Sequence, residues 1–149
     1  MQLILILALI FISCTNSSFF NKKNTEKEFY PNGQMKYFIQ KHNNKLDGYA
    51  KYWDENGNII NAVTYSNDVL HGKWIEYYTD GNIKYTVNYD YGLKEGEEIW
   101  YYSNGNKKSI IVYKEGKVFS DKMRWDKDGN LIHRWLNHLF SSFFQLFFS

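Results

Sequence analysis

The feature that most constrains this chain is the regular spacing of its glycines. Five glycines follow one another at intervals of 24 positions, and a second set of three keeps the same interval. An internal period of this length indicates a repeat architecture, in which each unit buries its apolar side chains against its neighbours. The first set is Gly33, Gly57, Gly81, Gly105 and Gly129, and the second is Gly48, Gly72 and Gly96.

One complete repeat, Asp80 to Gly105, has the pattern of a β-hairpin. Apolar and polar residues alternate from Ile83 to Tyr89, which is typical of a strand with one buried face. A longer turn over 90–96 leads to a second strand, Glu97 to Tyr102, which is rich in aromatic residues. Asn-Gly and Asp-Gly pairs, which accept positive φ, close the repeats. The sequence therefore predicts an all-β fold, a single-layer antiparallel meander of about nine or ten strands.

Superposing the repeats aligns apolar side chains in rows, which we expect to share one face of the sheet. The rows are Ile39, Val63, Val87 and Ile111; Tyr65, Tyr89 and Tyr113; Phe29, Trp53, Tyr77, Tyr101 and Trp125; and Ile75, Ile99 and Met123. The second face then presents other aromatic side chains to solvent. We predict these to form the candidate binding face: Tyr52, Tyr78, Trp100 and Tyr102.

The chain begins with an apolar, uncharged segment, residues 1–13, followed by Cys14, the only cysteine. The segment is too short for a comfortable membrane span and fits the apolar region of a signal peptide. With a small residue before the cysteine, it resembles a bacterial lipoprotein signal, which implies lipidation of Cys14 and membrane anchoring in the cell envelope. The alternative is an uncleaved apolar N-terminus with Cys14 as a buried thiol.

Two segments flank the predicted repeats, which occupy residues 29–134. Residues 14–28 are polar and aperiodic, as expected for a tether. Residues 135–149 continue an apolar spacing of three and four that begins near Ile132 and predicts an amphipathic helix. This helix would cap the last strand, whose edge is otherwise open, or make a second membrane contact. A third possibility is that a strand continues over 131–135.

The repeat resembles the MORN-repeat variant, as found in bacterial proteins labelled YwqK-family antitoxins. The matching motifs are Tyr30-Pro31-Asn32-Gly33, Asp47-Gly48 with Tyr52-Trp53, Asn56-Gly57, Tyr65, His71-Gly72 with Tyr77-Tyr78, Asp80-Gly81, Tyr89, Gly96 with Tyr101-Tyr102, Asn104-Gly105 and Tyr113. The resemblance implies a β-hairpin repeat scaffold that binds partners, and the label implies neutralisation of a toxin.

Catalytic, metal and nucleic-acid functions find no support in the sequence. The four histidines lack ligand spacing, and the segments 54–58 and 126–130, which are faintly similar to calcium loops, lack the glycine at the sixth position that such loops require. A formal net charge of +2 with no basic patch argues against a phosphate-driven nucleic-acid binder. We therefore predict a protein without enzymatic activity, metal or cofactor.

Three functions remain open. The first is a membrane-tethered module that binds a partner, which we expect to be a protein, through the aromatic face. The second is an antitoxin-like protein, which would have to stay in the cytoplasm to reach a cytosolic toxin. The third is a structural, membrane-associated protein of the envelope. The signal segment favours export, and with it the first of these functions.

Overall fold

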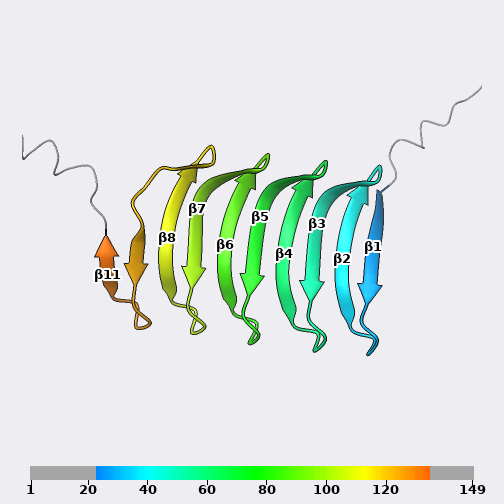
Figure 1. The fold of residues 1–149 in the computed structure, drawn as a ribbon, viewed down its shortest axis with the longest axis horizontal. Coiled ribbons are helices and arrows are strands. Elements are labelled where there is room, and N and C mark those ends of the chain that lie inside the picture. Colours follow the sequence, from blue (N-terminus) through cyan, green and yellow to red (C-terminus); the bar gives the residue numbers. More distant parts are fainter. Residues whose placement is uncertain (1–22, 135–149) are drawn as a thin grey trace, which may run out of the picture.

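The computed structural model describes residues 23–134, which form one antiparallel sheet of eleven strands in the order of the sequence (Figure 1). This arrangement confirms the predicted all-β hairpin meander. β9 lies off the main path and pairs only with β8. The strands are β1 (Lys23–Phe29), β2 (Met35–His42), β3 (Lys45–Trp53), β4 (Ile59–Ser66), β5 (Val69–Tyr77), β6 (Ile83–Asp90), β7 (Leu93–Tyr101), β8 (Lys107–Lys114), β9 (Lys117–Val118), β10 (Met123–Trp125) and β11 (Leu131–Arg134).

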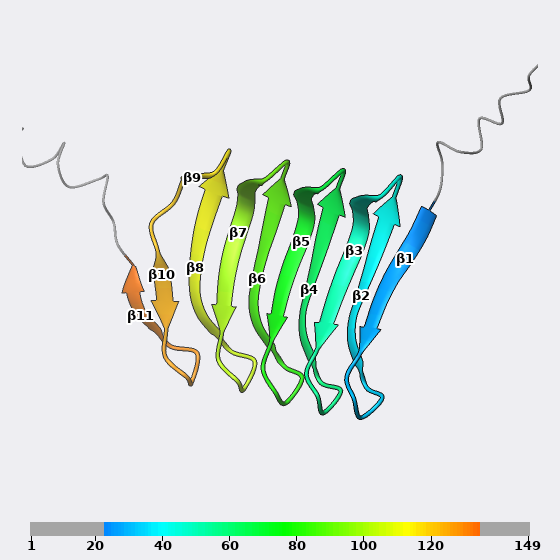
Figure 2. The same ribbon diagram turned by 45° about the vertical axis from the view of Figure 1, so that its right-hand side comes forward.

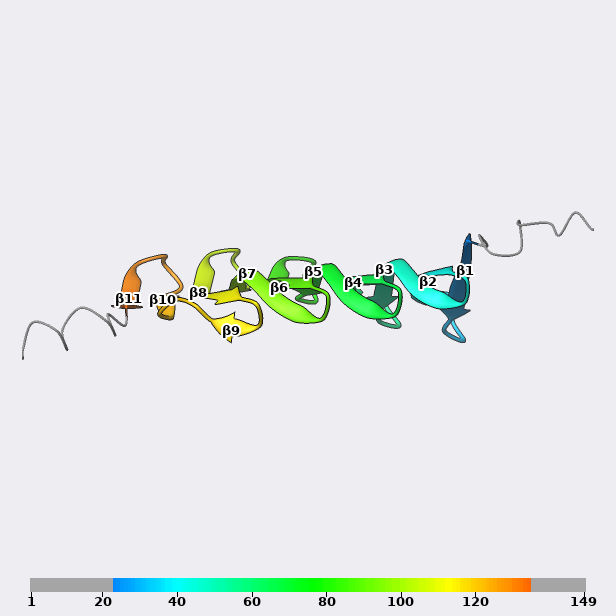
Figure 3. The ribbon, with the colours of Figure 1, turned by 90° about the horizontal axis from the view of Figure 1, so that it is seen from above.

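The described residues make a single layer. The strands stand side by side in the two side views (Figures 1 and 2), and the view from above shows no described element over either face (Figure 3). Each strand from β2 to β8 therefore exchanges backbone hydrogen bonds with two flanking strands, and within residues 23–134 no second sheet or helix packs on it. Within residues 23–134 no helix is long and apolar enough to cross a membrane.

Five-residue turns, here called the long turns, join one hairpin to the next at the lower end of Figure 1. In each, the first residue donates a backbone hydrogen bond to the fifth, as Tyr78 does to the carbonyl of Asn82. Gly81 has a φ of 84°, a left-handed conformation that glycine adopts without strain. The long turns are 30–34, 54–58, 78–82, 102–106 and 126–130.

Side chains join consecutive long turns to one another. The hydroxyl of Tyr78 donates to the carbonyl of Tyr101 (2.8 Å), and that of Tyr102 donates to the carbonyl of Trp125 (2.9 Å). The Asn82 amide likewise donates to the carbonyl of Ser103 (2.8 Å). Bonds of this kind run from the turn 30–34 to the next repeat, and likewise from 78–82 and from 102–106.

Two-residue turns at the opposite end correct the prediction of a longer turn over 90–96. Tyr91 and Gly92 alone form that turn, and both have positive φ, as a type I′ hairpin requires. Gly96, with a φ of 78°, instead lies inside β7. There three residues of β7, 96–98, oppose the single residue Val87 of β6, which makes a β-bulge. The periodic glycines of the second set thus mark bulges.

The register divides the side chains between two faces, because residues directly opposed on antiparallel strands share a face. One face carries the pairs Tyr85 with Trp100 and Val87 with Trp74, and we call it the tyrosine face. The other carries the pair Ile99 with Ile110, and we call it the isoleucine face. Here Ile75, Ile83, Ile99 and Tyr101 line a shallow groove of about 440 Å³.

The prediction that all apolar rows share one face is therefore wrong. The rows that contain Val87 and Tyr89 lie on the tyrosine face. The row of Ile75, Ile99 and Met123 lies on the isoleucine face, together with the row that contains Trp53 and Tyr77. Alternation shows which side chains of one strand share a face. Which faces of two adjacent strands correspond depends on the lengths of the turns and bulges between them, and those lengths differ from the predicted ones.

The core is thin and lies mostly under the tyrosine face. Ala50, Val63, Tyr85 and Val87 are buried on that face, and Ile110 on the other. Aromatic rings cover the smaller side chains, as the ring of Trp74 lies across from both Val63 and Val87. Most other apolar side chains stay half-buried, as expected for a single layer.

The N-terminal end of the repeat region differs from the prediction, and the sheet is irregular near its C-terminal end. Residues 23–28, which the sequence assigns to the tether, form most of β1, because ion pairs of Glu26 with Lys41 and Glu28 with Lys36 join this charged strand to β2. Near the other end, Ser120 replaces the bulge glycine and its hydroxyl accepts a hydrogen bond from the amide of Val112. The chain leaves the sheet at this point, between β9 and β10.

We expect the bonds between long turns to contribute measurably to stability. Tyr102→Phe removes one hydroxyl donor and should lower the free energy of unfolding by about 1 kcal/mol, as a shift of the urea midpoint. Tyr91→Phe is the control, since Tyr91 is 70% exposed. Equal midpoints for both variants would contradict a stabilising role for these bonds.

Candidate functional site

The four predicted binding residues do not lie together. Tyr52 and Trp100 are on the tyrosine face, on β3 and β7, whereas Tyr78 and Tyr102 lie in long turns and use their hydroxyls to bind the next repeat. All four are half-buried. The sequence predicts one apolar and one solvent-exposed face, whereas both faces of the sheet carry apolar and polar side chains. Tyr78 and Tyr102 bind adjacent repeats to each other.

A row of directly paired residues crosses the tyrosine face next to the long turns. Its chemistry alternates from one repeat to the next: two aromatic residues, two polar residues, two aromatic residues and two polar residues. We call it the alternating row. In strand order its members are Tyr37, Tyr52, Asn61, Glu76, Tyr85, Trp100, Ser109 and Arg124.

The first aromatic pair is fixed by charged groups of the edge strand. The rings of Tyr37 and Tyr52 are 6.3 Å apart, and the hydroxyl of Tyr37 donates to Oε1 of Glu26 (3.0 Å). Lys41 donates to the other oxygen of Glu26. The hydrogen bond to Glu26 and, to a smaller extent, desolvation raise the pKa of Tyr37 to about 12, so this hydroxyl stays protonated.

The second aromatic pair lies beside an ion pair whose carboxylate, Glu98, is buried and whose lysine, Lys94, is half-buried. The rings of Tyr85 and Trp100 are 4.5 Å apart, and Nε1 of Trp100 donates to Glu98 (3.3 Å). Glu98 is only 7% exposed and accepts a hydrogen bond from Lys94. Burial would raise the pKa of Glu98, but the bonds from Lys94 and Trp100 outweigh it and lower the pKa. Burial and the Glu98 charge raise the pKa of Tyr85 to about 12.

The two polar pairs carry opposite charge. Asn61 and Glu76 lie side by side on β4 and β5, and Glu76 contacts Lys84 through Oε2 (3.3 Å) while its side chain remains 30% exposed. Ser109 and Arg124 form the other pair, on β8 and β10. Ser109 lies in a hollow of about 390 Å³ whose other lining residues include Tyr102, Lys108, Lys122 and Arg124.

Two buried polar atoms near the centre of the tyrosine face have no hydrogen-bond partner. They are Oδ1 of Asn61, an acceptor, and Nε1 of Trp74, a donor, on the neighbouring strands β4 and β5. Leaving such groups unpaired costs about 1–3 kcal/mol each. Both atoms are closed off from solvent, so a partner on this face would reach them only after the side chains that cover them move.

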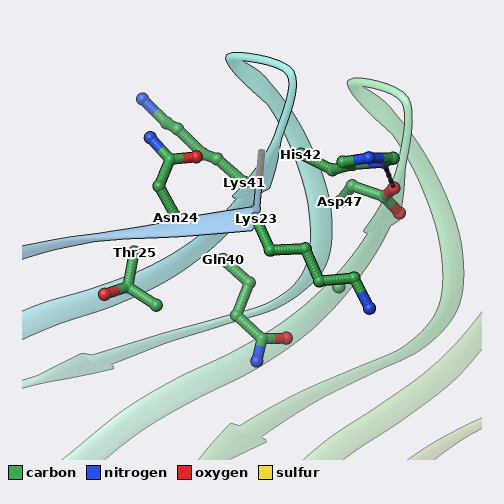
Figure 4. Close-up of a pocket in the computed structure, with 8 residues that line it drawn as sticks. Lys23, Asn24, Thr25, Gln40, Lys41, His42 and Asp47 are labelled. Carbon is green, nitrogen blue, oxygen red and sulfur yellow. Dashed lines mark ion pairs between the residues drawn. The ribbon is translucent and has the colours of Figure 1, made fainter. Parts of the chain in front are cut away.

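A hollow of about 380 Å³ at the N-terminal edge is less suited to binding (Figure 4). It contains a contact between Nδ1 of His42 and Asp47 (3.3 Å). In Figure 4, however, Asn24 and Lys41 point away from Thr25 and Gln40, so its lining residues leave the sheet on opposite sides. Such residues converge on no common ligand.

The described residues contain no cluster of three or more metal-ligating side chains. The two calcium-like segments are closed turns. Oδ1 of Asp54 accepts hydrogen bonds from the backbone amides of Asn56 and Asn58, and Asp126 does the same with Asp128 and Asn130. The side-chain hydrogen bond from Asn58 holds the pKa of Asp54 below its usual value, and that from Asn130 does so for Asp126.

The predicted signal segment, Cys14 and the predicted helix over 135–149 lie outside the described residues. The side chains of the described residues are suited to binding a partner. Aromatic rings provide apolar contact, and Glu76 and Arg124 of the row provide single charges of opposite sign. Sequence reasoning misses Asn61, Glu76, Ser109 and Arg124, although comparing every second repeat would have found their alternation.

We expect the ion pair of Glu98 with Lys94 to contribute to the free energy of unfolding, and we expect this contribution to be lost in acid. Because the folded pKa of Glu98 is lowered, its contribution is present above its ordinary value of 4.5 and is lost as pH falls through the folded pKa. Glu98→Gln should cost about 2 kcal/mol at pH 7 and progressively less in acid, as measured by urea unfolding.

The matched control is Glu97→Gln, because Glu97 is exposed and lies on the isoleucine face. A Glu98→Gln difference that stays constant from pH 7 to strongly acidic conditions would contradict the assignment of a charged, ion-paired Glu98.

Comparison with known families gives one result. A model described as MORN repeat variant matches residues 22–37, 46–67, 70–91 and 94–115, which together make up more than half of the chain. No curated protein matches the sequence.

Proposed function

Because the chain belongs to the MORN repeat variant family, a non-catalytic repeat type that commonly serves protein or membrane interaction, we propose that it is a non-enzymatic protein-interaction module. The tyrosine face is its binding surface. The observation that carries this proposal is the alternating row of aromatic and polar side chains on a face that no described element covers.

Three properties of the tyrosine face support a protein as the ligand. Half-buried Trp and Tyr side chains are the types enriched where proteins bind one another. Glu76 and Arg124 add single charges of opposite sign, which fix orientation. No described element lies over these side chains, so a partner can contact them directly.

Site-specific photocrosslinking tests the choice of face. A benzophenone amino acid at Trp100, on the tyrosine face, should give a crosslinked protein adduct when full-length chain is irradiated in living cells. The same group at the adjacent Tyr101, on the isoleucine face, is the control and should give little. Adducts from Tyr101 alone, or from neither position, would contradict the proposal.

We further propose that the module is anchored in the cell envelope by a lipid on Cys14. The apolar segment 1–13, with a small residue before Cys14, supports this. An antitoxin would use the same face on its partner, but export favours a partner in the envelope.

The mature protein should start at Cys14, carry added acyl mass and fractionate with membranes of a bacterial host. Intact mass spectrometry of both fractions measures this, and Cys14→Ala should abolish the acyl mass and the membrane association. An unmodified, full-length soluble protein would overturn the anchoring proposal and leave the face proposal untouched.

A further inference from the structure

We propose that the partner of the tyrosine face is a second copy of this chain, and that two copies associate about a two-fold axis parallel to β7. The inference rests on the proposed function of the tyrosine face. It starts from the alternating row, whose last five members, Glu76, Tyr85, Trp100, Ser109 and Arg124, are paired directly from strand to strand.

The order of these five residues is self-complementary. A two-fold axis along the strand direction through Trp100 turns one tyrosine face onto the other and keeps the row at the same height. It exchanges the residues that lie at equal distances on either side of β7. Glu76 of one copy then faces Arg124 of the other, and the reverse contact forms at the same time.

Size complementarity follows the same symmetry. Tyr85, one strand from the axis, is exchanged with Ser109, which lies one strand to the other side. The Tyr85 and Trp100 rings, 4.5 Å apart, form the larger feature, and Ser109 lies in the hollow of about 390 Å³. Tyr85 of each copy thus lies over the hollow of the other, and the two Trp100 side chains meet beside the axis.

The charge of whole strands agrees with this pairing. Residues 107–134 contain eight Lys and Arg but four Asp and Glu, which gives +4. Residues 59–90, on the other side of β7, contain two Lys but four Asp and Glu, which gives −2. The symmetry places the basic stretch of each copy over the acidic stretch of the other, so the net charges of the two stretches attract.

The same symmetry keeps like charges apart. Glu76 and Arg124 are separated by four strand spacings, or about 19 Å at the usual spacing of antiparallel strands. Two copies related by the axis therefore keep the two Glu76 carboxylates well apart. The interface also covers apolar side chains that a single layer leaves half-exposed.

Charge reversal tests the proposal on the full chain. Two differently tagged copies are expressed in the same cells, and one tag is used to recover the other. The wild-type copies should co-purify, and light scattering of the complex should give the mass of two chains. Glu76→Arg in both copies, or Arg124→Glu in both, should reduce the recovery about tenfold or more, because two like-charged contacts replace two attractive ones.

The decisive sample combines Glu76→Arg in one copy with Arg124→Glu in the other. In that pair every contact at the two positions is again between opposite charges, so the recovery should return to near the wild-type value. Glu97→Arg and Lys73→Glu are the controls, because they make the same charge changes at exposed positions of the isoleucine face and should have no effect. Thermal melting of each variant checks folding.

Failure of this inference differs from failure of the proposed function. If wild-type copies never co-purify while Trp100 crosslinks to another protein, the second-copy inference is overturned and the interaction module stands. Wild-type dimers that both single variants leave intact, or that the mixed pair fails to restore, overturn the assigned axis. Absence of any adduct from the tyrosine face overturns both.

Discussion

Each strand is held mainly by its neighbours in the sheet, because residues 23–134 form one layer. Most domains gain stability by packing one layer on another, and here that contribution is missing among the described residues. The fold depends instead on hydrogen bonds along the sheet and on side chains that bridge adjacent strands. Ion pairs, ring contacts and the bonds between long turns all act across one or two strands. Stability is therefore local and accumulates with every repeat.

The same constraint explains why aromatic residues are so frequent. A single layer has no interior between two sheets, so a side chain must find cover beside it, on the same face. Trp74 and Trp100 are large enough to cover Val87 and Tyr85 from a neighbouring strand. Such cover is partial, and the rings that provide it remain in contact with solvent. The residues that stabilise the sheet are thus also the residues that a partner would touch.

Repeat length, strand alternation and turn glycines were enough to predict the fold class and the strand order. The sequence could not assign faces, because the face of Ile75 relative to Val87 depends on the long turn 78–82 and on the register shift beside it, between Glu76 and Tyr77. Tyr78 and Tyr102 look like exposed surface aromatics, yet their hydroxyls reach backbone carbonyls 23 residues away. Glu98 gives no sign in the sequence that it is buried, since its neighbour Lys94 approaches only across the Gly96 bulge.

The alternating row has a consequence for how such a chain can change in length. Adding one repeat of 24 residues would preserve every turn and every backbone hydrogen bond, so the sheet itself would tolerate it. The surface would not be preserved, because the row repeats only every 48 residues, from Tyr37 to Tyr85. If an odd number of repeats is inserted, the row beyond the insertion is shifted by one repeat. Aromatic residues then stand at positions that polar residues held before, and polar residues replace aromatic ones. Insertions or losses of repeats in pairs leave both the sheet and its surface pattern in phase.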